Sequence, residues 1–270
     1  MNENIKKFVI EAITRLINHT ASDTKINKLV GKHRKKIHFI PIRYRIFGGL
    51  LQSMNIQFGN FIEELLHTIV ENEDNLRIIE PSGNRSIELP LTAESDRLID
   101  EYITERQNDT NFPQNLLNAF NNLIEQLFEI EKNKQDKQIT TKHDIDVLFQ
   151  TNNNELIYLE VKYNDDHDTG KYVDINRKFI KTYIGLCNIK NIYDINRFKP
   201  ILYFLTPKIM KGNIYIPESQ NIYRGERLFN EYFSLTYDEL DDFMRNIGDN
   251  EDIKSLFDSL YDKIRNKIEI

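Results

Sequence analysis

Residues 143–164 read HDIDVLFQTNNNELIYLEVKYN and carry the clearest structural signal in the chain. Two short runs rich in Val, Ile, Leu, Phe and Tyr, HDIDVLF and ELIYLEVKY, flank a polar stretch at residues 150–154. Such runs are typical of β-strands, and asparagine tolerates left-handed backbone conformations. The stretch therefore predicts a β-hairpin.

Charged side chains interrupt the second run of this hairpin. Residues two apart in a strand share a face, so Glu160 and Lys162 lie roughly 6 to 7 Å apart along the chain. If the loop centres on Asn153, antiparallel pairing places Asp146 opposite Glu160 and Asp144 opposite Lys162. Two carboxylates that close repel each other unless a cation lies between them. Hard oxygen ligands with open positions suit Mg²⁺, which can activate water for a displacement at phosphorus.

The same spacing has a purely structural interpretation. Two charges in an apolar strand are costly unless they are paired or used, and a partly buried salt bridge of Lys162 with Glu160 or Asp144 would pair them. The acid-x-Lys pattern also occurs at residues 23–25 and 252–254, but there in polar segments without a preceding strand. Local spacing leaves both interpretations open.

Together, HDIDVLF, the hairpin and YLEVKYN resemble the active site of the PD-(D/E)xK nuclease superfamily, which includes most type II restriction endonucleases. The extended run E-x-K-x-N, followed by D-T-x-K at residues 168–171, is similar to what several of these enzymes carry. IYRGERLFNEYF resembles a late segment that often has tryptophan where Phe229 stands. The resemblance spans residues 58–206, and the subfamily it suggests is the HinfI/TdeIII type. One departure is that Ile145 replaces the proline that nominally precedes Asp146.

The resemblance implies an α/β fold with a PD-(D/E)xK restriction-endonuclease-like core, in which helices flank a central mixed β-sheet, and a largely helical N-terminal half. It assigns Lys162 as the catalytic lysine and Asp146, Glu160 and Val161 as Mg²⁺ ligands. Asp146 is preferred to Asp144 because it directly precedes the apolar strand; Asp144 is then a secondary ligand or a solvated neighbour. An auxiliary acid is expected in FGNFIEELL, with Glu63 as the candidate and Glu64 as the register alternative.

The reaction implied by the resemblance is Mg²⁺-dependent, sequence-specific hydrolysis of double-stranded DNA that leaves 5′-phosphates. A palindromic site requires two matched active sites, so a homodimer is expected. A cognate DNA methyltransferase is expected as a functional partner rather than a bound one. Two alternatives stay open: another DNA nuclease of this fold, acting in repair or on junctions, or a non-catalytic nucleic-acid-binding module.

The charge distribution bears on the DNA prediction. The 36 Lys+Arg and 42 Asp+Glu give a net charge of −6, which argues against a polyanionic partner, but residues 24–62 contain no acid. Basic side chains interleaved with aromatic ones suit a phosphate backbone, although a solvated helix face would show the same composition. Asn164 and Lys171 either touch phosphate or shape a polar turn beside the hairpin. The candidate DNA-binding residues are Lys32, Arg34, Lys35, Lys36, Arg43, Arg45, Asn164 and Lys171.

The sequence contains no internal repeat and no Gly/Ser-rich linker, which predicts one domain over residues 1–270, in three regions. Residues 1–140 are mainly helical and contribute to DNA binding, 141–210 form the catalytic hairpin, helix and strand, and 211–270 are a C-terminal helical region. Residues 88–91 mark a break and 132–142 a polar connector. Helices are expected at 4–17, 58–70, 91–102, 116–130, 176–187, 238–247 and 253–268, and further strands at 200–206 and 213–216.

Composition excludes several classes of protein. Apolar residues make up 40% and charged residues 29% of the 270, as in ordinary soluble proteins. No stretch approaches the roughly 18 to 20 apolar residues of a membrane span, and the first 16 residues are expected to form an amphipathic helix rather than a signal peptide. Cys187 is the one cysteine, which excludes a disulfide framework and favours a reducing, cytoplasmic setting.

Three competing motifs are weaker. Gly170-Lys171-Tyr172 and Tyr183-Ile184-Gly185 imitate the GIY-YIG nuclease spacing, but polar residues precede the first motif and a helix explains the second better. The histidines form no zinc-binding pair. The acidic residues at 165–168 are typical of a solvent-exposed turn rather than a metal loop.

Overall fold

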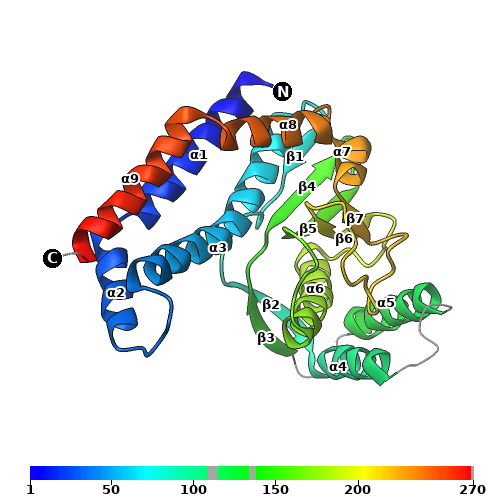
Figure 1. The fold of residues 1–270 in the computed structure, drawn as a ribbon. Coiled ribbons are helices and arrows are strands. Elements are labelled where there is room, and N and C mark those ends of the chain that lie inside the picture. Colours follow the sequence, from blue (N-terminus) through cyan, green and yellow to red (C-terminus); the bar gives the residue numbers. More distant parts are fainter. Residues whose placement is uncertain (109–114, 134–137, 269–270) are drawn as a thin grey trace. The chain divides into compact units, whose positions relative to one another are not determined.

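The computed structural model describes residues 1–108, 115–133 and 138–268 (Figure 1). The chain divides into two compact units, which we call the helical unit (residues 1–65 and 235–270) and the sheet unit (residues 66–234). One boundary falls inside a long helix, and the other follows residue 234. The single domain expected over residues 1–270 stays a prediction.

The helical unit is built from amphipathic helices. Apolar side chains recur at helical spacing on α1, which buries Ile5, Val9 and Ala12. Thr236 and Glu239 form a reciprocal capping box that fixes the start of α8. α9 packs against α1 and α8. The helices are α1 (Glu3–Thr20), α2 (Asp23–Arg34), the first part of α3 (Ile42–Glu71), α8 (Tyr237–Gly248) and α9 (Glu251–Ile268).

A five-stranded mixed sheet forms the centre of the sheet unit. Its order is β1-β4-β5-β6-β7, with antiparallel pairs β1–β4 and β4–β5 and parallel pairs β5–β6 and β6–β7. This confirms the predicted α/β fold with a mixed sheet. The strands are β1 (Leu76–Ile78), β4 (Val147–Thr151), β5 (Leu156–Lys162), β6 (Phe198–Phe204) and β7 (Ile222–Arg224).

Helix α6 (Thr169–Lys190) is the crossover that lets β6 run parallel to β5. Asp168 caps its first turn by accepting a hydrogen bond from the backbone N–H of Lys171, and Asn191 ends it with a φ of 53°. The helix packs against α4 (Ala93–Asn108), α5 (Leu116–Asn133) and β2 (Ile87–Thr92), which pairs with β3 (Gln138–His143). The buried Cys187 lies in this core. Among the described residues, no helix is long and apolar enough to cross a membrane.

The hairpin register agrees with the predicted one, because Val147 lies opposite Leu159. This pairing centres the loop on residue 153. Asn154 adopts a φ of 62°, as a left-handed loop residue should. The helices expected at 4–17, 116–130, 238–247 and 253–268 are also found, with small shifts at their ends.

Three predictions of secondary structure were wrong, and helix α2 was not anticipated. The break at 88–91 lies inside β2, and 138–142 of the expected connector form β3; residues 134–137 lie outside the described residues. The two strands pair with each other and accommodate polar residues that are also typical of a connector. Glu88 and Lys142, for example, form an ion pair across the two strands. The strand expected at 213–216 is a loop, because the Asn213 side chain accepts hydrogen bonds from the N–H groups of Tyr215 and Ile216.

Close packing of α6 on β2 gives a stability prediction. A Cβ at Gly185 would lie 2.6 Å from the Leu89 Cβ, which is not a flexible chain end. We expect Gly185→Ala to lower the free energy of unfolding by about 1 to 3 kcal/mol through overpacking. Gly59→Ala is the control, because the space around Gly59 in α3 is open. There alanine should raise the unfolding free energy by up to about 1 kcal/mol. Chemical denaturation measures both, and equal effects would contradict the packing argument.

Candidate active site

The Glu160 carboxylate on β5 is fully buried and hydrogen-bonded on both oxygens. Its Oε1 accepts from Lys162 Nζ at 2.8 Å and from Lys178 Nζ at 3.1 Å. Its Oε2 accepts from the Tyr158 hydroxyl at 2.6 Å. A buried carboxylate is tolerated only with such partners.

Asp146 joins this cluster from the residue before β4. It is 4% exposed, and its Oδ2 accepts a hydrogen bond of 2.8 Å from the backbone N–H of Val161. Lys162 Nζ lies 3.5 Å from the same oxygen and donates to the Val161 carbonyl oxygen at 2.7 Å. The Lys162 ammonium is therefore enclosed by oxygens of Asp146, Glu160 and Val161. The structure brings together the four residues that the sequence had grouped here.

Opposing electrostatic effects act on Glu160. Burial raises the pKa of its carboxyl group, but the ammonium groups of Lys162 and Lys178 outweigh burial and hold the pKa well below its usual value. The carboxylate is thus ionised at neutral pH. Its two oxygens therefore serve as charged hydrogen-bond acceptors, and the group is not a neutral acid.

Tyr158 and Lys178 were missed by reasoning from the sequence alone. Tyr158 lies two residues before Glu160, so strand alternation alone would have placed both on one face. Lys178 comes from α6, and no local spacing connects a helix residue with a strand 18 positions earlier.

The donor set fits a hard divalent cation. Two carboxylates and one carbonyl oxygen converge, and an ammonium already lies among them. Mg²⁺ is typically held by one or two carboxylates while it keeps several waters. Within the described residues no three Asp, Glu, His or Cys side chains gather as a complete metal cage, so the remaining positions would be open to water or phosphate.

Asp144 is not brought opposite Lys162, because β4 begins only at Val147. Its Oδ1 instead accepts from the Ser86 N–H at 2.8 Å, and its Oδ2 lies 3.4 Å from an Arg85 guanidinium nitrogen. The side chain is half-exposed. This favours the solvated neighbour over the secondary ligand.

The remaining sequence candidates before the hairpin belong to the helical unit. Glu63 is half-buried and Glu64 exposed on α3. Arg45 donates to the backbone carbonyls of His33 and Lys36 at 3.2 and 3.3 Å, so it braces the loop between α2 and α3. Arg43 lies over the Tyr44 ring, 4.9 Å from its centroid. The exposed basic side chains around the end of α2 are Lys32, Arg34, Lys35 and Lys36.

Comparison with known proteins decides the family. The model of the type II restriction endonuclease HinfI family matches residues 1–248. The type II restriction enzyme HinfI of Haemophilus influenzae is 43% identical over 267 residues, which is 98% of each chain. No solved structure matches. The chain belongs to the HinfI family of type II restriction endonucleases.

Family membership confirms the predicted class of enzyme, a site-specific deoxyribonuclease of a restriction system. It also confirms the suggested subfamily. Neither comparison assigns roles to individual residues, so the roles of Asp146, Glu160 and Lys162 remain proposals.

In this HinfI-family chain, the loop after β5 differs in one respect from the expected polar turn. The Asn164 side chain accepts from the Asp166 N–H, Asp168 caps α6, and Lys171 is exposed. Asp165 is fully buried, so the prediction of a solvent-exposed turn was wrong at this position. Its carboxylate accepts hydrogen bonds from the N–H groups of residues 210, 211 and 212, at 3.0 to 3.3 Å, and from an Arg224 nitrogen at 3.1 Å.

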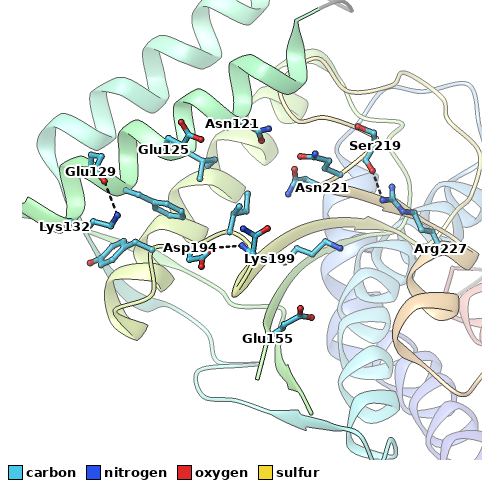
Figure 2. Close-up of a pocket in the computed structure, with 16 residues that line it drawn as sticks. Asn121, Glu125, Glu129, Lys132, Glu155, Asp194, Lys199, Ser219, Asn221 and Arg227 are labelled. Carbon is cyan, nitrogen blue, oxygen red and sulfur yellow. Dashed lines mark hydrogen bonds and ion pairs between the residues drawn. The ribbon is translucent and has the colours of Figure 1, made fainter. Parts of the chain in front are cut away.

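A separate cavity of about 1050 Å³ lies at the other end of the sheet (Figure 2). Glu155, Lys199 and Asn221 line it, and these residues stand at or before the first residues of β5, β6 and β7. Its opposite wall is α5, where Lys132 pairs with Glu129. Glu160 and Lys162 stand at the far end of β5, so this cavity is distinct from the acidic cluster.

The buried Asp165 gives a prediction about pH. Burial raises the pKa of this carboxyl group. The backbone N–H donors of Met210 and Lys211 lower the pKa and outweigh burial, so the pKa lies below its usual value of 3.8. The ionised carboxylate therefore stabilises the folded state above pH 3.8, and this contribution is lost as the pH falls below that value. We expect Asp165→Asn to lower the free energy of unfolding at pH 7 by about 2 kcal/mol or more, because its amide cannot serve all these donors.

The measurement is denaturant unfolding of wild type and variant from pH 7 to pH 3 in buffer of constant ionic strength. The difference in unfolding free energy between wild type and Asp165→Asn should become smaller as the pH falls toward 3. Asp166→Asn changes an exposed neighbour and should leave stability within about 0.5 kcal/mol of wild type. A difference in unfolding free energy that stays constant with pH would contradict the claim that the ionised Asp165 carboxylate stabilises the folded state.

Proposed function

We propose that this HinfI-family enzyme cleaves double-stranded DNA in a Mg²⁺-dependent reaction at the Asp146–Glu160–Lys162 cluster and leaves 5′-phosphates. Asp146, Glu160 and the Val161 carbonyl oxygen are the metal ligands. One observation carries the proposal: the Lys162 ammonium lies among these three oxygens, within 2.7 to 3.5 Å of each. A merely structural salt bridge would need only one of them.

When bound, Mg²⁺ would supply positive charge for the phosphate and lower the pKa of a coordinated water. This chain's own residues do the positioning. Tyr158 and Lys178 fix both oxygens of Glu160, and the Val161 N–H fixes Asp146. Lys162 keeps 21% of its side chain exposed, so its ammonium can turn toward a phosphate or the attacking water while Lys178 still balances Glu160.

The other assignments are proposals on weaker support. Glu63, or Glu64 in the alternative register, is proposed as the auxiliary acid. The exposed basic side chains at residues 32–36 are proposed to contact the DNA backbone, which is supported by the fully exposed Ile37 and 94% exposed Phe39 beside them. Arg43, Arg45, Asn164 and Lys171 are also proposed as DNA-binding residues.

The proposed biological setting follows from restriction chemistry. We propose a homodimer, because a palindromic site presents two equivalent phosphodiesters to two equivalent active sites. A cognate DNA methyltransferase would act beside the enzyme rather than bind it. The buried Cys187 thiol supports a reducing, cytoplasmic setting.

Cleavage of plasmid DNA tests the catalytic assignment. Wild type in Mg²⁺ should give discrete bands, and EDTA should abolish them. Glu160→Ala and Lys162→Ala should each lower the cleavage rate by about 100-fold or more, because each removes a group at the reacting phosphate. Glu155→Ala and Lys142→Ala are matched controls on exposed side chains near the hairpin and should cut at the wild-type rate.

Each other outcome has a distinct meaning. A smear in place of bands would indicate a nuclease without site specificity, and binding without cutting would indicate an inert module. If Glu160→Ala and Lys162→Ala cut like wild type, the active site lies elsewhere.

The hydroxyl of Tyr158 gives a finer test of the metal site. Partners of metal-binding carboxylates typically contribute 10- to 100-fold to metal affinity or activity, so Tyr158→Phe should raise the Mg²⁺ concentration for half-maximal cleavage by about 10-fold. Tyr183→Phe is the matched control: this tyrosine is equally buried, but its hydroxyl donates to the Phe198 carbonyl at 2.7 Å. Both variants should lose similar stability, and only the first should change the Mg²⁺ dependence. An identical Mg²⁺ titration for both would refute the role of Tyr158.

A further inference from the structure

An exposed loop follows β6, the strand that pairs in parallel with β5. Residues 207–211 read PKIMK, and every one of them is exposed; we call them the 207–211 loop. Ile209 is 58% and Met210 46% exposed, and a lysine stands on each side of the pair. Two adjacent large apolar side chains in water, flanked by cations, form a surface that suits a partner with both apolar and anionic groups.

Backbone hydrogen bonds tie the start of this loop to the proposed active site. The N–H of Leu205 donates to the Lys162 carbonyl, and the N–H of Thr206 to the Tyr163 carbonyl, both at 2.9 Å. The chain therefore leaves β6 directly alongside the proposed catalytic lysine. Tyr163, whose carbonyl accepts the bond from Thr206, is itself 50% exposed.

The backbone of the loop is rigidly held although its side chains are exposed. The buried Asp165 carboxylate binds the N–H groups of Met210, Lys211 and Gly212. At the other end, Pro207 packs so closely on Gly225 that a Cβ there would lie 2.9 Å from the proline Cβ. The loop is thus presented in a fixed conformation, which lowers the entropic cost of binding a partner.

DNA is the partner that this chemistry fits. Proteins that bind in the grooves often place Ile, Leu or Met against base steps, and apolar side chains also contact the thymine methyl group. Flanking lysines suit the phosphates on either side of a groove. Because the loop adjoins Lys162, DNA with a phosphate at the proposed active site would pass over it.

We propose that the 207–211 loop is a DNA-contacting element of this enzyme, with Ile209 and Met210 against base and sugar edges beside the scissile phosphate and Lys208 at a flanking phosphate. This inference rests on the proposed active site. It goes beyond that site by assigning substrate contacts, and therefore part of the site preference, to residues that take no part in the chemistry.

The test measures DNA binding with a mapped substrate. Wild-type cleavage of a plasmid in Mg²⁺ locates the cut sites, and a labelled duplex spanning one of them is then bound in Ca²⁺ without Mg²⁺. The double variant Ile209→Ser with Met210→Ser should raise the Kd by about 10-fold or more, because it removes two apolar side chains from the proposed contact with base edges. Its thermal stability and its dependence on salt should match wild type. Lys208→Ala should instead reduce the salt slope of binding by about 1.

Ile189→Ser is the matched control, because Ile189 is 43% exposed at the end of α6 in the same unit. It should bind the duplex like wild type. Sedimentation of the double variant tests whether the loop contacts a second copy of the chain instead of DNA. A changed oligomeric state with unchanged DNA affinity per active site would show such a contact and overturn the proposal. Unchanged affinity and unchanged oligomeric state would overturn it as well.

The two proposals fail separately. If wild type does not cut, or Glu160→Ala still cuts, the proposed active site is wrong. If wild type cuts, Glu160→Ala does not, and the double variant binds the duplex like wild type, the active site stands and only the loop assignment fails.

Discussion

The fully buried Glu160 carboxylate is the constraint on which the site depends. An ionised acid in the middle of a sheet is tolerated only when several donors reach it, so β5 must carry Tyr158 and Lys162 on the same face and α6 must bring Lys178 against it. Each donor in turn restricts a neighbouring element. The position of Lys178 on α6 and the geometry of the proposed metal site are therefore both tied to one buried charge.

The mixed sheet explains why so many groups meet at one end of β5. This strand is antiparallel to β4 and parallel to β6. The first residues of β4 and the last residues of β6 consequently reach the same end, where Asp146 and the 207–211 loop lie. An all-parallel sheet would place the start of β4 at the opposite end. The change of strand direction at β5 thus brings the proposed metal ligands and the proposed DNA contacts together.

Features that depend on interactions between nearby residues could be predicted from the sequence, whereas those that depend on distant segments could not. The hairpin, its register and the grouping of Asp146 with Glu160 were predictable, because strand alternation and loop length determine them locally. Lys178 was not, because it depends on how α6 crosses the sheet. The burial of Asp165 was not predicted for the same reason. An acidic run usually stays in water, and the donors that allow this burial come from later parts of the chain, the N–H groups of residues 210–212 and Arg224. The pairing of β2 with β3 was likewise invisible, since neither strand alternates clearly.

Glu160 and Asp165 stand on either side of Lys162 and use buried negative charge in two different ways. Glu160 is balanced by the ammonium groups of two partly exposed lysine side chains, which a cation and a phosphate could redirect in the proposed mechanism. Asp165 is satisfied largely by backbone N–H groups and by Arg224, whose guanidinium is itself held over the Phe204 ring. Such partners cannot leave without unfolding the loop. In the proposed mechanism the first carboxylate is therefore available for chemistry, whereas the second has a structural role and holds the 207–211 loop beside the proposed catalytic cluster.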